Sequence, residues 1–177
     1  MTQQCRDPST KVLGRGDLVS RFGRPRTETL IFTNGCFDLL HWGHAAYLRQ
    51  ARGLGDVLAV GINSDRSVRA LKGRGRPLMS EQDRGLLLAS LEFVDVVTVF
   101  DEATPEQLLA ELLPDVLVKG SDYGLHEIAG REVVEEAGGR VLTIPLLPGR
   151  STSSLITRIQ EGRAIALAPD STGEERP

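Results

Sequence analysis

Two histidines with two residues between them, His41 and His44, are the side chains whose type and spacing best suit chemistry. On the first turn of a helix this spacing places both imidazoles on one face, near the end where backbone N–H groups attract anions. Gly43, between them, has no side chain, so a ligand can approach the backbone closely. The alternatives are two solvent-facing histidines or a metal pair, although no third metal ligand is evident. The pattern favours a phosphate-binding site.

Four consecutive hydroxyl side chains, at positions 151–154, open the last predicted helix. One N-cap requires only one hydroxyl. The others, together with free backbone N–H groups, could form a phosphate cradle. A redundantly capped helix is the alternative.

Basic and acidic residues follow other predicted strands. Lys72 lies in a Gly-rich basic loop, at 71–77, that could close over a polyphosphate, or could be a flexible surface loop. Lys119 could bind an anion and Asp122 could accept a hydrogen bond from a ribose hydroxyl, unless both belong to an ordinary turn. Arg84 is of a kind most often found on a solvated helix face, and Cys36 has no base beside it that would make it a nucleophile.

Short apolar runs alternate with helical segments along the chain. Strands are predicted at 29–33, 57–62, 94–100, 115–118 and 141–144, and helices at 42–54, 64–71, 80–91, 104–113, 130–137 and 151–160. Near-continuous apolar strands joined by helices indicate βαβ crossovers and a buried parallel sheet. The expected fold is α/β: a doubly wound, Rossmann-like sheet of about five parallel strands with helices on both faces. In such sheets ligands bind beyond the carboxyl ends of the strands, where the residues above lie.

The length of 177 residues fits one domain with tails. We expect an N-terminal extension with a short helix at 1–27, the domain at 28–160 and a C-terminal tail at 161–177. A net charge of −3 disfavours general nucleic-acid binding. The longest uncharged stretch, at 39–48, is too short to span a membrane. Two cysteines without metal or disulfide spacing fit the reducing cytoplasm.

Taken together, these motifs resemble a known family. Phe37 and Asp38 followed by the sequence His-Trp-Gly-His at 41–44, with the sequence Gly-Arg-Ser-Thr-Ser-Ser at 149–154, are similar to the cytidylyltransferase-like nucleotidyltransferases. Segments 33–38, 63–65, 71–73, 76–77 and 118–123 most resemble the nucleotidyltransferase half of the bifunctional heptose kinase/adenylyltransferases. The resemblance covers about residues 28–160.

The resemblance implies a role for each matching residue. The catalytic residues would be His41, His44 and Lys72, the last neutralising the α-phosphate or the incoming sugar phosphate. The nucleotide would be bound by Thr33, Gly35, Cys36, Phe37, His41, His44, Asp122, Gly149, Arg150, Ser151, Thr152, Ser153 and Ser154. The sugar phosphate would be bound by Asp38, Lys72, Arg84 and Lys119. No protein-held metal is implied.

The implied reaction joins D-glycero-β-D-manno-heptose 1-phosphate to ATP, giving ADP-heptose and pyrophosphate, with Mg²⁺ accompanying the triphosphate. A CTP-dependent enzyme acting on heptose phosphate or glycerol 3-phosphate is one alternative, and a non-catalytic nucleotide-binding regulatory domain is another. The expected partners are the two substrates, a separate sugar kinase and a second copy of the chain in a homodimer, without nucleic acid or membrane.

Overall fold

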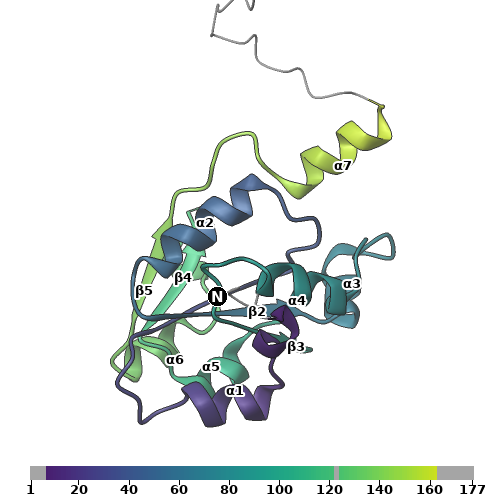
Figure 1. Cartoon of the computed structure of the whole chain (residues 1–177). Coiled ribbons are helices and arrows are strands. Elements are labelled where there is room, and N and C mark those ends of the chain that lie inside the picture. The colour runs from purple at the N-terminus through teal and green to yellow at the C-terminus, as the bar shows by residue number, and fades with distance from the viewer. Residues whose placement is uncertain (1–6, 122–123, 163–177) are drawn as a thin grey trace, which may run out of the picture.

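A five-stranded, fully parallel sheet organises the chain (Figure 1). The structure is a computed structural model and describes residues 7–121 and 124–162. Its strands are β1 (Leu30–Gly35), β2 (Val57–Asn63), β3 (Val96–Phe100), β4 (Val116–Gly120) and β5 (Arg140–Ile144). They lie in the order β3-β2-β1-β4-β5. This arrangement confirms the predicted doubly wound sheet and places its switch point between β1 and β4, where such folds bind ligands.

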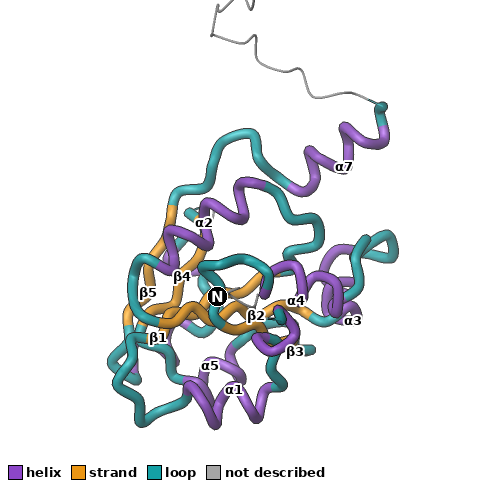
Figure 2. The backbone as a smooth tube through the Cα atoms, in the orientation of Figure 1, coloured by secondary structure: helices purple, strands orange, loops and turns teal. Residues whose placement is uncertain are grey.

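Helices cover both faces of the sheet (Figure 2). The seven α-helices are α1 (Arg15–Phe22), α2 (Trp42–Arg52), α3 (Asp65–Lys72), α4 (Glu81–Ala89), α5 (Glu106–Leu112), α6 (Arg131–Glu136) and α7 (Thr152–Gln160). Short 3₁₀ helices lie at Pro8–Lys11 and Leu125–Glu127. The predicted helix 104–113 begins later than expected, because Pro105 occupies the N-cap of α5 rather than its first turn.

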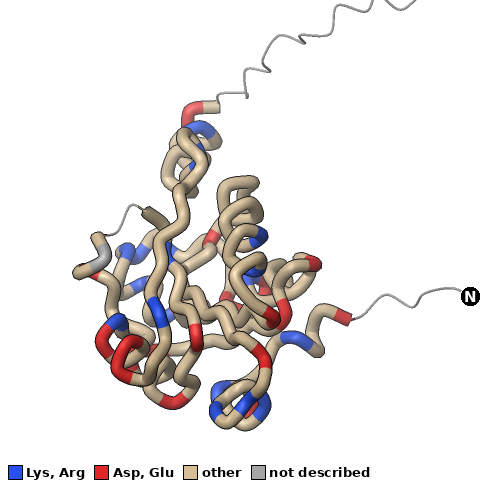
Figure 3. The backbone as a smooth tube through the Cα atoms, turned by 90° about the vertical axis from the view of Figure 1, so that its left-hand side faces the viewer, with Lys and Arg blue, Asp and Glu red and all other residues tan. Residues whose placement is uncertain are grey.

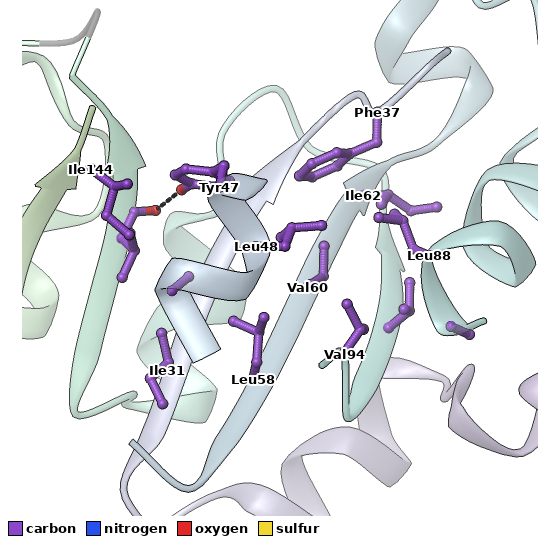
Figure 4. Packing of buried hydrophobic residues seen from close by; sticks show 14 of the residues in the cluster. Ile31, Phe37, Tyr47, Leu48, Leu58, Val60, Ile62, Leu88, Val94 and Ile144 are labelled. Atoms are coloured by element: carbon purple, nitrogen blue, oxygen red, sulfur yellow. Dashed lines mark hydrogen bonds between the residues drawn. The ribbon is translucent and has the colours of Figure 1, made fainter. Parts of the chain in front are cut away.

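Two apolar clusters divide the core between the two faces of the sheet. On one face Leu48 of α2 and Leu88 of α4 pack on strand residues such as Leu58 and Val60 (Figure 4). On the other face lie Leu18 of α1, Leu109 of α5 and Val134 of α6, with other apolar side chains of the second cluster. Both faces of the strands are therefore buried, which explains why they appear in the sequence as unbroken apolar runs.

The N-terminal segment packs onto the domain. Val12 forms a parallel bridge with Val97 beside β3, and Lys11 donates hydrogen bonds to the carbonyls of Leu91 and Val94. Arg26 pairs with Asp115 at 2.8 Å, although its side chain is only 6% exposed. Residues 7–27 thus share one core with the rest of the fold.

Helix α7 differs from the other α-helices, because it contains no buried residue. It follows an extended linker after β5 and stands away from the body of the molecule (Figure 3). Its first turn nevertheless returns to the site, where Thr152 Oγ1 donates to the Leu39 carbonyl at 3.4 Å.

Candidate active site

The two histidines lie together at the start of α2, just beyond β1. His41 is the N-cap residue and His44 lies on the first turn. Their rings are stacked with centroids 3.8 Å apart, and the ring of Phe37 lies 5.2 Å from that of His44. The two histidines, called the His pair below, therefore occupy one side of the helix, as their spacing predicts.

Gly43 has a structural reason to be glycine. A Cβ at this position would lie 2.9 Å from two atoms of the His41 ring and 3.0 Å from Cβ of Arg150. The absent side chain lets the His41 ring fold against the helix and lets the linker before α7 approach. These contacts give Gly43 a reason that is separate from the ligand approach expected from its sequence position.

Both imidazoles favour the neutral form. Burial and the neighbouring His41 lower the pKa of His44 to about 4. Burial and the charge of Arg150 also lower the pKa of His41. Among the described residues, the buried Nδ1 atom of His41 has no hydrogen-bond partner. A neutral imidazole retains one N–H donor, which suits a hydrogen bond to a phosphate oxygen.

The His pair opens into a cleft of about 650 Å³ at the switch point of the sheet. The cleft brings together segments that follow all five strands. The sequence-predicted residues that line it are Gly35, Cys36, Phe37, Asp38, His41, His44, Lys72, Lys119, Arg150, Ser151, Thr152 and Ser153.

Cationic side chains from three parts of the chain line this cleft. Lys72 and Arg76 follow β2, Lys119 ends β4 and Arg150 follows β5. Lys119 Nζ donates to the carbonyl of Asn34 at 3.1 Å, which fixes it beside β1. This concentration of positive charge, in a chain of net charge −3, makes the cleft suited to a polyanion.

Two residues predicted to bind ligands are enclosed by the protein instead. Thr33 has no exposed surface, and its hydroxyl lies 2.7 Å from the Tyr47 hydroxyl. Arg84 is also fully buried, and its guanidinium donates to the carbonyls of Cys36 and Asn63. In this structure the side chains of Thr33 and Arg84 are therefore closed off from the cleft, and their predicted ligand contacts stay predictions.

The burial of Arg84 also rules out the solvated helix face as its position. It donates to the Met79 carbonyl and to Asp65 Oδ1 at 2.8 Å. A buried guanidinium needs such a set of acceptors because its charge is costly to desolvate. Arg84 therefore joins the ends of β1 and β2 to α4.

Asp38 lines the cleft but is directed toward the protein. It is 2% exposed and forms an ion pair with Arg76. Cys36 lies close by, and burial raises the pKa of its thiol. The thiol therefore stays protonated, in agreement with its exclusion as a nucleophile.

The hydroxyl cluster is divided between capping the helix and lining the cleft. Ser151 Oγ accepts the N–H of Ser154 and so caps α7, while Ser154 Oγ donates to the Ser151 carbonyl within the first turn. Ser153 lines the cleft, whereas Gly149 and Ser154 do not. Asp122 lies outside the described residues.

Arg76 was not assigned a site role from the sequence, although it lies in the basic loop. The apolar wall formed by Leu146 and Leu147 was also missed. Arg74 lies in the same loop but does not line the cleft. The charge pattern of the loop therefore could not show which of its arginines reaches the site.

The described residues were compared with what a metal site and a membrane-spanning helix require. Within residues 7–121 and 124–162, no group of three or more His, Cys, Asp or Glu side chains could hold a metal ion. No helix in this part of the chain is long and apolar enough to cross a bilayer.

Comparison with known proteins identifies the family of the chain. A family model described as Cytidylyltransferase-like matches residues 32–158, which include the His pair and the hydroxyl cluster. The chain belongs to the cytidylyltransferase-like family. Its five-stranded parallel sheet is the Rossmann-like nucleotidyltransferase fold, which confirms the resemblance found in the sequence.

Individual relatives of this cytidylyltransferase-like chain are longer proteins. "Bifunctional protein HldE" of Syntrophotalea carbinolica is 56% identical over 136 residues, covering 77% of this chain and 28% of the relative. The protein of the same name from Citrifermentans bemidjiense is 50% identical over 157 residues, covering 88% and 32%. The chain thus spans 28–32% of the length of these relatives.

A solved structure has the same fold. The lipopolysaccharide core biosynthesis protein from Thermoplasma volcanium superposes with a TM-score of 0.57 at 27% identity. The match covers 68% of this chain and 98% of that protein.

Proposed function

We propose that this cytidylyltransferase-like domain joins D-glycero-β-D-manno-heptose 1-phosphate to ATP, producing ADP-heptose and pyrophosphate. The observation that carries the proposal is the stacked, neutral His pair placed in one cleft with the α7 hydroxyls and the cations. The similarity to proteins named HldE supports the heptose substrate.

The chemistry is an in-line displacement at phosphorus. An oxygen of the sugar 1-phosphate forms a bond to the α-phosphorus of ATP, and the bond from that phosphorus to the β-phosphate bridging oxygen breaks. The electron pair leaves with pyrophosphate. The nucleophile is already anionic at neutral pH, so no strong general base is needed, and catalysis consists of positioning and charge stabilisation.

Side chains of the cleft supply this stabilisation. The His pair donates hydrogen bonds to oxygens around the α-phosphorus, where charge develops. The first turn of α7, with Ser151–Ser153 at its start, binds phosphates through N–H and hydroxyl groups. Lys72 and Lys119 add positive charge from the two sides of β1.

Magnesium would enter with the nucleotide. The charged side chains that line the cleft are four cations and two carboxylates, Glu127 and the buried Asp38, which is already paired with Arg76. These residues therefore fit a triphosphate that carries its own Mg²⁺. When bound, the ion would neutralise part of the triphosphate charge.

We also propose a source for the sugar phosphate, a compartment and an oligomeric state. A sugar kinase would supply the heptose 1-phosphate, which the word "bifunctional" in the relatives' name supports. The chain would act in the cytoplasm as a homodimer. Light scattering of the purified protein tests the dimer directly.

The substrate assignment is tested by pyrophosphate release from ATP, CTP, GTP and UTP, each with heptose 1-phosphate or glycerol 3-phosphate. Release with ATP and the heptose alone is expected. Preferential release with CTP would move the chain to another branch of the family. Nucleotide binding without release under any pairing would favour a regulatory domain.

A further inference from the structure

We propose that Arg76, oriented by the buried carboxylate of Asp38, binds the phosphate of the incoming sugar 1-phosphate. Asp38 is in this view a positioning residue and does not touch the substrate. The inference rests on the proposed function for the identity of the substrate. It adds a binding residue that neither the sequence motifs nor the family match assigned.

The carboxylate of Asp38 is fully occupied by one segment of the chain. Its Oδ1 accepts the backbone N–H groups of Leu78 and Met79, at 2.8 and 3.0 Å. Its Oδ2 accepts Nε of Arg76 in an ion pair. A carboxylate that is 2% exposed and holds three donors has little capacity left for a ligand.

Residues 76–79, which hold Asp38, are also bound by Arg84. The Met79 carbonyl accepts Nε of Arg84 at 3.2 Å, and Arg84 Nη1 reaches the Cys36 carbonyl. Both backbone polar groups of Met79 are thus bound by charged side chains. Since Cys36 and Asp38 lie in the loop that leads to the His pair, the loop containing Arg76 is tied to the catalytic loop.

Arg76 retains donors that point to a ligand. Its side chain is 21% exposed and lines the cleft. Only Nε is bonded, and among the described residues its Nη1 and Nη2 atoms have no partner. A guanidinium presents five N–H donors in a rigid plane, so fixing Nε aims the remaining four. Such a fork is suited to two oxygens of a phosphate.

Arg76 and the α7 hydroxyls come from different parts of the fold. Arg76 lies in the loop between α3 and α4, after β2, whereas the α7 hydroxyls follow β5. An in-line displacement needs the incoming phosphate and the leaving pyrophosphate on opposite sides of the α-phosphorus. Because the proposed function assigns the triphosphate to the start of α7, we assign the separate donors of Arg76 to the sugar phosphate.

Steady-state kinetics of variants at Arg76 and Arg74 test the assignment. Arg76→Met should raise KM for heptose 1-phosphate roughly 10- to 100-fold, the effect of losing a charge-assisted hydrogen bond. The KM for ATP should stay within about twofold. Arg74→Met is the matched control, because Arg74 is an exposed cation of the same loop that does not line the cleft. It should change neither constant by more than about twofold.

Asp38→Asn tests positioning. Asparagine keeps an oxygen for the Leu78 and Met79 amides but loses the charge that holds Arg76. The KM for the sugar phosphate should rise by about tenfold, and the double variant with Arg76→Met should be no worse than Arg76→Met alone. Additive losses, or equal increases in both KM values with a lower Tm, would show a purely structural role and overturn the assignment.

A binding measurement separates this inference from the substrate proposal. With the nucleotide site filled by α,β-methylene-ATP and Mg²⁺, inorganic phosphate should bind the wild type at least about fivefold more tightly than Arg76→Met. Arg74→Met should match the wild type. If the wild type turns over no sugar phosphate but this difference persists, the substrate assignment fails and Arg76 stands. If Arg76→Met instead weakens the nucleotide analogue, or binds phosphate normally, the inference is wrong.

Discussion

The His pair provides the most direct prediction at the scale of single residues. Replacing His44 by alanine removes a donor aimed at the α-phosphorus, so turnover should fall about 10²- to 10³-fold. The Tm should change little, because the core clusters do not include this ring. His126→Ala is the control, since that exposed histidine lies outside the cleft. Near-normal turnover of His44→Ala would remove the His pair from the mechanism.

The low pKa of His44 also predicts how stability depends on pH. Its folded-state pKa of about 4 lies below the ordinary value of 6.5. Between these values the unfolded chain binds a proton that the folded chain does not, so the free energy of unfolding should decrease as pH falls from 6.5 to 4. Urea denaturation should give a smaller decrease for His44→Gln than for His126→Gln. Equal slopes would contradict the buried, neutral ring.

Side-chain positions could be predicted from sequence only where the local pattern determines them. The placement of the His pair and Lys72 at the cleft follows from their spacing and from the strands they come after. The burial of Arg84 does not, because it depends on carbonyls from β1 and β2 that are distant in sequence. The burial of Thr33 could not be predicted for the same reason, since its partner Tyr47 approaches from α2.

At the scale of elements, Gly43 allows α2 and the α7 linker to meet. Gly43→Ala should displace the His41 ring or Arg150, whose atoms lie within 3.0 Å of the added Cβ, and reduce turnover by more than about tenfold. Gly85→Ala is the matched control inside α4, where the nearest atom would be 3.7 Å away. It should keep full activity and raise stability by up to about 1 kcal/mol. Equal activity of the two variants would contradict the account.

Strands and helices were largely predictable because their signals are local. The apolar runs of β2 and β3 and the Ser80 cap of α4 lie in the sequence itself. The N-cap of α5 was missed, because Pro105 fits either the cap or the first turn. The lack of packing around α7 depends on neighbours that no local pattern reveals.

For the whole molecule, the N-terminal segment should contribute to stability. Leu18 of α1 has no exposed surface and belongs to the second core cluster. Leu18→Ala should therefore lower the free energy of unfolding by about 2–5 kcal/mol in urea titrations. Leu87→Ala, which removes a 42% exposed side chain from α4, should cost less than about 1 kcal/mol. Equal losses would show that α1 does not share the core.

The fold class could be predicted from the alternation of strands and helices. The packing of the N-terminal segment on the domain could not. The parallel sheet could be predicted because its strands are apolar on both faces. The packing of residues 7–27 on the domain depends on contacts such as Lys11 with the Leu91 and Val94 carbonyls, which carry no sequence signal.

The central claim is that the cleft transfers an adenylyl group to a sugar 1-phosphate. The most direct measurement is the initial rate of pyrophosphate release from MgATP, with and without D-glycero-β-D-manno-heptose 1-phosphate, for wild type and His44→Ala. The account predicts release that requires the sugar phosphate, yields ADP-heptose in equal amount and falls at least about 10²-fold in the variant. Wild-type protein that binds MgATP but releases no pyrophosphate when the heptose is added would contradict it.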